Sequence, residues 1–333
     1  MTNILVTGGA GYIGSHTCKA LARAGYTPIT YDNLSSGNRW AVRWGPLEEG
    51  DLLDEARLAD VFARHAPVAV MHFAARSLVG ESMRAPALYY SANVHGGLNL
   101  LNACRAAGCR HLIMASSCAV YGTPPHMPIT EAVPPAPINP YGASKLMLER
   151  MLADFDAAHG QTFVALRFFN AAGADEDGEI GERRPQETHL IPLVLDAVTG
   201  RRPPLTVLGE DYPTPDGTAV RDYLHVGDMA GLHLRALDRL LSGGESAVLN
   251  IGTGHGASVR EVIEMAAEVT GQPVPHIKGP RRAGDPPTLV ADATAAERLL
   301  GRDLLPRSTL RTIMQTAWGW HSSPAYADTW AHD

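Results

Sequence analysis

The sequence predicts a doubly wound α/β fold, with a large parallel sheet and a smaller C-terminal α/β part. Short apolar runs alternate with longer helical patterns through the first half of the chain. The apolar runs are continuous, which is typical of parallel strands that are covered on both faces. A glycine-rich segment joins the first apolar run to the first helical pattern, as phosphate-binding α/β folds require.

The expected elements follow in chain order. Strands are predicted at 3–8, 27–32, 67–74, 111–117 and 162–170, and helices at 12–25, 54–65, 86–107 and 140–158. After residue 170 the chain becomes polar and rich in glycine over 171–187, and helices are predicted at 227–242, 258–270, 292–300 and 308–320. The apolar run 247–254 is expected to return to the main sheet. We therefore place one domain at 1–173, joined by about 222–254, and a second mainly at 174–333.

Composition limits the function classes. The chain has 333 residues, a net charge of −7 and a pI near 6.0, so nucleic acid is not an expected partner. No stretch is apolar enough to span a membrane and no signal peptide is recognised, so we expect a soluble cytoplasmic protein. The four cysteines lack metal-ligand spacing and the 14 histidines form no H-x-x-x-H pattern, so no metal is expected.

The segment "VTGGAGYIGSH" lies between the first strand and the first helix. Gly8, Gly11 and Gly14 have the spacing that allows a tight turn, close backbone approach to a pyrophosphate, and packing of the helix on the strand. Asp32 ends the second strand about twenty residues on, where a carboxylate binds ribose hydroxyls and repels a 2′-phosphate. The sequence therefore predicts a Rossmann domain that binds NAD in preference to NADP.

Lys145 is one of only three lysines in a chain with 28 Lys and Arg residues. It lies four residues after Tyr141 in "NPYGASK", where Asn139 and Pro140 favour a helix start. Tyr141 and Lys145 then share one helix face. A free tyrosine is a poor base at neutral pH, and we expect the ammonium and the positive nicotinamide ring to lower its pKa. A surface lysine beside a packed tyrosine is the alternative interpretation.

Ser116 and Ser117 end the strand "HLIMASS", at the sheet edge where open α/β sheets bind ligands. The order of glycine turn, serine at a strand end and Tyr-x-x-x-Lys resembles the extended branch of the short-chain dehydrogenase/reductase superfamily. Further motifs, among them "YDNLSSG", "HFAARSLVGES", "RFFNAAGA", "DGTAVRDYLHV" and "RRAGDPPTLVADATAA", resemble the UDP-glucose 4-epimerase family along nearly the whole chain.

This resemblance implies an NAD-dependent isomerase of galactose metabolism that interconverts UDP-galactose and UDP-glucose, with N-acetylated UDP-sugars as further candidates. It implies that Tyr141 is the acid/base, that Lys145 tunes it and holds the nicotinamide ribose, and that Ser117 bonds the sugar 4-hydroxyl. The implied cofactor set is Gly8, Gly11, Tyr12, Ile13, Gly14, Asp32, Asn33, Asp51, Leu52, Phe73, Ala74, Ala75, Asn93, Ser116, Tyr141, Lys145 and Phe168. The implied substrate set is Ser117, Tyr141, Asn170, His189, Leu190, Thr206, Val207, Leu208, Arg221, Tyr223, Arg282, Asp285 and Leu289.

Members of this family are commonly homodimers, and the long helices at 86–107 and 140–158 are the expected contact. The chain departs from the common pattern at Arg76 and Ser77 (often Lys), Phe168 (often Tyr) and His189 (often Asn). Leu289 stands where a bulky tyrosine tends to exclude N-acetylated sugars.

Alternatives remain among related enzymes and outside them. A 4,6-dehydratase or a UDP-glucuronate decarboxylase needs an acidic residue beside the serine, where this chain has Cys118 and Ala119. An epimerase for another sugar nucleotide remains open. A non-catalytic NAD sensor is the alternative from another class, although such proteins usually lack the tyrosine or the lysine.

Overall fold

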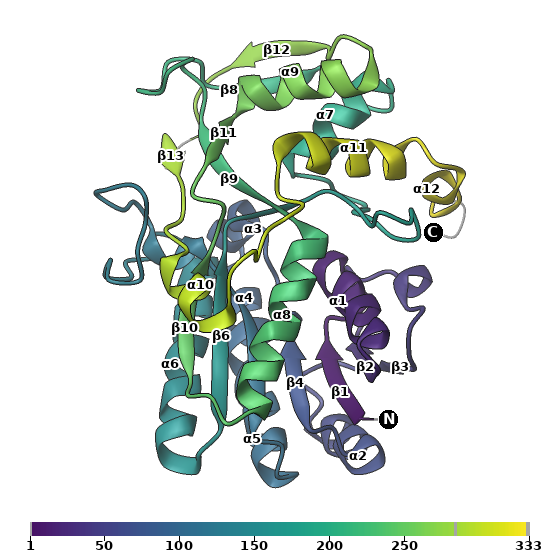
Figure 1. Ribbon diagram of the computed structural model, residues 1–333, viewed down its shortest axis with the longest axis vertical. Helices are drawn as coiled ribbons and strands as arrows, with labels where there is room; N and C mark the ends of the chain where they lie inside the picture. Colours follow the sequence, from purple (N-terminus) through teal and green to yellow (C-terminus); the bar gives the residue numbers. More distant parts are fainter. Residues whose placement is uncertain (1, 283–284, 331–333) are drawn as a thin grey trace.

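The computed structural model describes residues 2–282 and 285–330. Figure 1 shows a large sheet flanked by helices and, beyond the carboxyl ends of its strands, a smaller part with α7, α9 and α11. No helix in these described ranges is long and apolar enough to cross a membrane.

The large sheet has seven strands, and every pairing in it is parallel. Its order is β10 (Ala247–Ile251), β6 (Thr162–Phe168), β5 (His111–Ser117), β4 (Ala69–His72), β1 (Thr2–Thr7), β2 (Tyr26–Asp32) and β3 (Leu47–Glu49). The strand order therefore reverses between β1 and β4, and the crevice beyond this point is where such sheets bind ligands. The predicted doubly wound Rossmann sheet is confirmed.

Helices cover both faces of this sheet. One hydrophobic core packs the sheet against α1 (Tyr12–Arg23), α8 (Val226–Leu241) and α10 (Thr294–Leu300). The other packs it against α2 (Glu55–His65), α5 (Gly96–Ala106) and α6 (Pro140–His159). Both faces of the strands are buried, which explains their continuous apolar sequences.

The helix predicted at 86–107 is interrupted. It consists of α4 (Pro86–Tyr89), a π-helical turn η2 (Tyr90–His95) and α5, and the short α3 (Val79–Arg84) precedes it. Asn93 lies in the π-helical turn, and its amide group bonds both backbone groups of Arg76. Turns of this kind are frequent at functional sites.

The smaller part surrounds a third core, built from α7 (Leu190–Val198), α9 (Val259–Thr270), α11 (Leu310–His321) and strands of two small sheets. One sheet holds β7 (Asn170–Ala172), β9 (Val220–His225), β11 (Gly256–Ser258) and β13 (Thr288–Leu289), and the other holds β8 (Leu205–Leu208) and β12 (His276–Gly279). The remaining short elements are η1 (Arg39–Ala41), η3 (Cys118–Tyr121) and α12 (Pro324–Asp328).

Within 222–254, β9 stays in the small sheet, whereas α8 packs on the large sheet and β10 pairs with β6. The division into domains at 173/174 stays a prediction.

Candidate active site

The glycine turn lies at the point where the strand order reverses. Gly8 has a φ of +73°, and a Cβ atom there would lie 2.5 Å from the amide nitrogen of Ala74, beyond β4. A Cβ atom on Gly14 would lie 2.2 Å from the carbonyl oxygen of Gly8. Only glycine fits at both positions, which brings the N-terminus of α1 close to the turn. Tyr12 and Ile13 begin that helix, and the Tyr12 hydroxyl donates to the carbonyl of Gly173 at 2.6 Å.

Asp32 ends β2 beside this turn and is buried. Its carboxylate accepts hydrogen bonds from the amides of Ala10 (3.0 Å) and Leu34 (2.8 Å). Burial raises the pKa of Asp32, and these two amides offset part of the rise. At the adjacent strand end, Asn33 donates to Asp51 at 2.7 Å, and Leu52 is buried next to Asp51. The predicted cofactor residues Asp32, Asn33, Asp51 and Leu52 therefore lie at the carboxyl ends of the neighbouring strands β2 and β3.

Further predicted cofactor residues lie at the carboxyl ends of β4 and β6 and in η2. Phe73 and Ala74 follow β4 and donate their amides to the carbonyl of Thr7, and Ala75 comes next. Asn93 joins this loop to α6, since its side chain donates to Ser144 at 2.9 Å. Phe168 ends β6, and its ring and that of Phe73 both contact His233, which sequence reasoning missed.

Ser117, Tyr141 and Lys145 come together at the carboxyl edge of β5. Asn139 caps α6 and accepts a hydrogen bond from the amide of Gly142 at 2.8 Å, so Tyr141 lies in the first turn. The Lys145 Nζ donates to the carbonyl of Ala115 at 2.9 Å, which fixes the helix against β5. The Tyr141 ring meets Tyr89 edge-on, with 6.5 Å between ring centroids.

The pKa values differ from the expectation for Tyr141. Burial raises the pKa of Tyr141, while contact with the Ser117 hydroxyl and the charge of Arg184 lower it. Burial also lowers the pKa of Lys145 to about 8, against an opposing effect of Glu149. We predicted that Lys145 and the nicotinamide ring lower the pKa of Tyr141; in the protein alone, burial dominates. Arg184 comes from the loop at 171–187, and its approach to Tyr141 had no signal in the sequence.

Several predicted substrate residues meet around β9. Arg221 donates to Asp285 at 2.6 Å and pairs in register with Leu289 of β13. Asn170 of β7 pairs in register with Tyr223. Tyr212, which sequence reasoning missed, is buried nearby, and its pKa is raised by burial and by Asp285 and lowered by Arg221.

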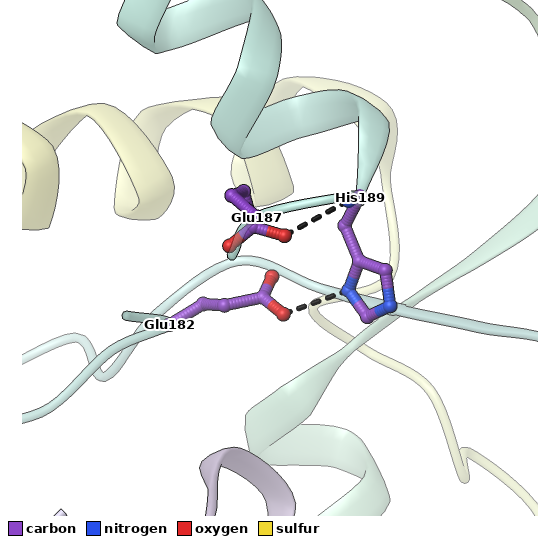
Figure 2. Close-up of side chains that lie close together, drawn as sticks. All are labelled: Glu182, Glu187 and His189. Atoms are coloured by element: carbon purple, nitrogen blue, oxygen red, sulfur yellow. Dashed lines mark hydrogen bonds and ion pairs between the residues drawn. The ribbon is translucent and has the colours of Figure 1, made fainter. Parts of the chain in front are cut away.

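His189 and Leu190 begin α7 beside two carboxylates (Figure 2). The His189 Nδ1 lies 2.7 Å from Glu182 Oε1, and the His189 amide donates to Glu187 at 2.8 Å. Arg184 also donates to Glu182, at 3.0 Å. These groups offer metal-ligand atoms, but both carboxylates already have partners within the protein, so the cluster holds the start of α7.

The structure does not bring all predicted substrate residues into one contact group. Thr206 and Leu208 are exposed on β8, and Val207 is buried between them. These three residues lie in the two-stranded sheet with β12. Arg282 is exposed, and its carbonyl accepts a hydrogen bond from the amide of Asp285 at 3.2 Å.

Comparison with known proteins gives a consistent result. Residues 4–252 match the NAD dependent epimerase/dehydratase family. The chain is 51% identical to the UDP-glucose 4-epimerase of Rhizobium meliloti (strain 1021) over 320 residues, 96% of this chain and 97% of the relative.

Two solved structures are similar throughout. The UDP-glucose 4-epimerase from Brucella ovis in complex with NAD has a TM-score of 0.93 and 52% identity, covering 96% of this chain and 98% of that one. The UDP-Glc/GlcNAc 4-epimerase from Campylobacter jejuni has a TM-score of 0.84 and 40% identity, covering 96% and 99%. The family predicted from the motifs is confirmed: the chain belongs to the NAD dependent epimerase/dehydratase family and, within it, to the UDP-glucose 4-epimerases.

Proposed function

We propose that this protein interconverts UDP-galactose and UDP-glucose by transient oxidation at C4 of the sugar, with NAD that stays bound. The observation that carries the proposal is the convergence of Ser117, Tyr141 and Lys145 at the carboxyl edge of the sheet, the edge that also carries the glycine turn. The family and its close relatives support the same activity.

The residues around the crevice fit a dinucleotide. No side chain fits at Gly8 or Gly14, which keeps the turn tight and α1 close to the strand, as in a dinucleotide-binding turn. The Asp32 carboxylate at the end of β2 suits ribose hydroxyls. When bound there, NAD would supply a hydride acceptor and donor for C4 of the sugar.

The chain's own groups handle the proton and the orientation. Tyr141 removes the proton of the 4-hydroxyl, which Ser117 holds by a hydrogen bond. Because the pKa of Tyr141 is raised by burial, this transfer depends on nearby groups that stabilise the phenolate. Ser117 and Arg184 lower this pKa in the protein, and Lys145 supplies a buried ammonium one helical turn away.

Substrate anchoring belongs to the residues around β9. Arg221 suits a diphosphate, and its pairing with Asp285 orients the guanidinium. We assign the nucleotide to this region together with Asn170, His189, Leu190, Tyr223 and Arg282. Firm contacts on the nucleotide leave the sugar free to turn and present its other face.

The direct test is to incubate the purified protein with UDP-galactose, without added NAD, and to measure UDP-glucose. We expect conversion, together with release of NAD(H) from the denatured protein in near-stoichiometric amount. A nucleotide-free preparation that consumes NAD as a co-substrate would overturn the proposal.

Substrate breadth depends on Leu289. This half-buried side chain packs against the cluster of Val120, Tyr121 and Ile129, which also contacts Cys118 beside the active serine. Leucine is smaller than tyrosine, so we expect UDP-N-acetylglucosamine to be a measurable but poorer substrate than UDP-glucose. A solved relative from Campylobacter jejuni is named for both sugars.

The variant Leu289→Tyr should lose activity on the acetylated sugar selectively, and Leu289→Met should keep the wild-type ratio of the two activities. Assays on both pairs of sugars measure this ratio. An unchanged ratio in Leu289→Tyr would remove Leu289 from the sugar site.

We also propose a homodimer through the helices at 86–107 and 140–158. Apolar side chains are exposed on these helices (Leu88, Leu98 and Met147) and on the short α3 before them (Met83). Exposed apolar side chains that gather into a patch are typical of an interface. Sedimentation should give twice the chain mass, and Leu98→Glu with Met147→Glu should give the single mass; a monomeric wild type contradicts this proposal.

A further inference from the structure

A buried ion pair lies behind the catalytic helix. Glu149 of α6 and Arg167 of β6 are each 5% exposed. Arg167 donates to both carboxylate oxygens of Glu149, from Nε at 3.0 Å and from Nη2 at 2.6 Å. This two-point contact fixes both side chains.

The pair also reaches the serine strand and the sheet edge. The Ser116 hydroxyl, next to Ser117, donates to Glu149 Oε1 at 2.5 Å. Arg167 Nη1 donates to the Tyr121 hydroxyl at 2.6 Å, and that hydroxyl donates to Asn250 of β10 at 2.7 Å. Glu149 therefore connects the helix that carries Tyr141 and Lys145 with the strand that ends in Ser117.

Stability alone is a weak reason for this network. Replacing a buried ion pair by apolar side chains of similar volume is often neutral or stabilising. Here the pair begins one helical turn after Lys145, which is 4% exposed and whose ammonium donates to a backbone carbonyl. A buried ammonium needs a negative charge nearby to remain protonated.

The groups that face Lys145 are few. Glu149 raises the pKa of Lys145 against the effect of burial. His72 of β4 has a pKa lowered to about 3 by burial and by Lys145, so it is neutral. Tyr141 lies on the same helix, Arg167 of β6 lies beyond Glu149, and Tyr121 of η3 lies beyond Arg167. Among the described residues, Glu149 is therefore the carboxylate that acts on Lys145.

We propose that Glu149, held by Arg167 and Ser116, is a positioning residue of the reaction, which keeps Lys145 an ammonium and fixes the serine strand against the catalytic helix. The inference rests on the proposed function for its kinetic readout. It has a second readout that does not depend on activity.

The main variant is Glu149→Gln, studied as the purified protein with its bound nucleotide. We expect kcat for UDP-galactose to fall by about tenfold with KM within about twofold, because misplacement of the catalytic groups affects the reaction more than binding. The alkaline limb of the pH–rate profile should move down by about one pH unit. Glu149→Asp keeps the charge, so its alkaline limb should return toward that of the wild type.

The chain's three lysines allow a direct measurement. Labelling lysine with ¹³C at Cε gives three side-chain signals, and Lys145→Arg identifies that of Lys145. Its titration should move to lower pH in Glu149→Gln, by the same shift as the kinetic limb. This readout holds even if UDP-galactose is not the substrate, in which case only the proposed function fails.

Two control variants distinguish a positioning role of Glu149 from a role in folding alone. Glu48 is also a buried carboxylate held by arginines, Arg57 and Arg64, but at the far strand β3. Glu48→Gln should lose stability without changing the Lys145 titration or the alkaline limb of the pH–rate profile. In the double variant Glu149→Gln/Arg167→Gln, which leaves no unpaired arginine, the Lys145 titration should stay shifted. A wild-type Lys145 titration in Glu149→Gln, or its recovery in the double variant, would overturn the proposal.

Discussion

Two of the three lysines, Lys19 of α1 and Lys145 of α6, lie on opposite faces of the large sheet, and each is 4% exposed. Lys19 contacts three carboxylates, those of Asp175 (2.6 Å), Asp177 (2.7 Å) and Glu179 (2.5 Å). Within the part of the chain that the structure describes, Lys145 donates to one acceptor, the backbone carbonyl of Ala115, at 2.9 Å. Two lysines with the same exposed fraction therefore have different electrostatic environments.

The neighbouring carboxylates distinguish the pKa values of the two lysines. Burial lowers the pKa of Lys19, but the three carboxylates outweigh it and the net pKa is raised. Burial dominates at Lys145 and lowers its pKa to about 8. Lys19 ties the loop at 171–187 to the helix that follows the glycine turn. An incompletely neutralised buried lysine is a candidate functional residue.

The largest expected effect is a loss of turnover when Lys145, the lysine with less negative charge around it, is replaced. Lys145→Arg keeps the charge but replaces a compact ammonium with a planar fork, so we expect kcat to fall by about a hundredfold or more, as in Tyr141→Phe. UDP binding, measured by calorimetry, should be retained in both. Lys19→Arg is the matched control and should keep wild-type turnover. Near-normal turnover and pH profile in Lys145→Arg would show that the size of the cation is unimportant.

The second effect is a loss of folding stability when Lys19, the lysine that contacts three carboxylates, is replaced. Lys19→Met leaves Asp175, whose side chain is 9% exposed, without its cation, so we expect the free energy of unfolding to fall by about 2 kcal/mol; the more exposed Asp177 and Glu179 add little. Denaturant unfolding measures this change. Lys19→Met/Asp175→Asn should recover part of it. A loss of turnover per folded molecule without a loss of stability would assign Lys19 to the reaction instead.

Local sequence predicted much of this arrangement. The glycine turn, the end of β2 at Asp32 and the helix start at Asn139 depend on neighbours in the chain, and each has the predicted place in the structure. The family followed from motifs spread along the chain and is confirmed.

Long-range contacts could not be predicted in this way. The Glu149–Arg167 pair joins a helix to a strand, and its only signal was an arginine inside the apolar run "TFVALRFFN". The environment of Lys19 depends on how a loop more than 150 residues away folds back on α1. The raised pKa of Tyr141 likewise depends on burial, which the Tyr-x-x-x-Lys spacing does not reveal.

The smallest expected effect is a pH dependence of stability that distinguishes the two lysines. Below pH 8 the folded and unfolded states both carry the Lys145 ammonium, and its burial destabilises the folded state fully. Between pH 8 and the ordinary value of 10.5 the folded state releases the proton first, so stability rises with pH relative to Lys145→Met. We expect a relative gain of about 1 kcal/mol from pH 7 to pH 9 in nucleotide-free protein, measured by denaturant unfolding.

Lys19 should behave in the opposite way, because its pKa is raised. A cation with a raised pKa stabilises the folded state fully below the unfolded pKa of 10.5, so the stability difference between the wild type and Lys19→Met should be flat from pH 7 to pH 9. Titrations common to all three proteins cancel in these differences. A flat difference for Lys145→Met as well would mean that Lys145 is as well neutralised as Lys19, and the electrostatic distinction between the two sites would be lost.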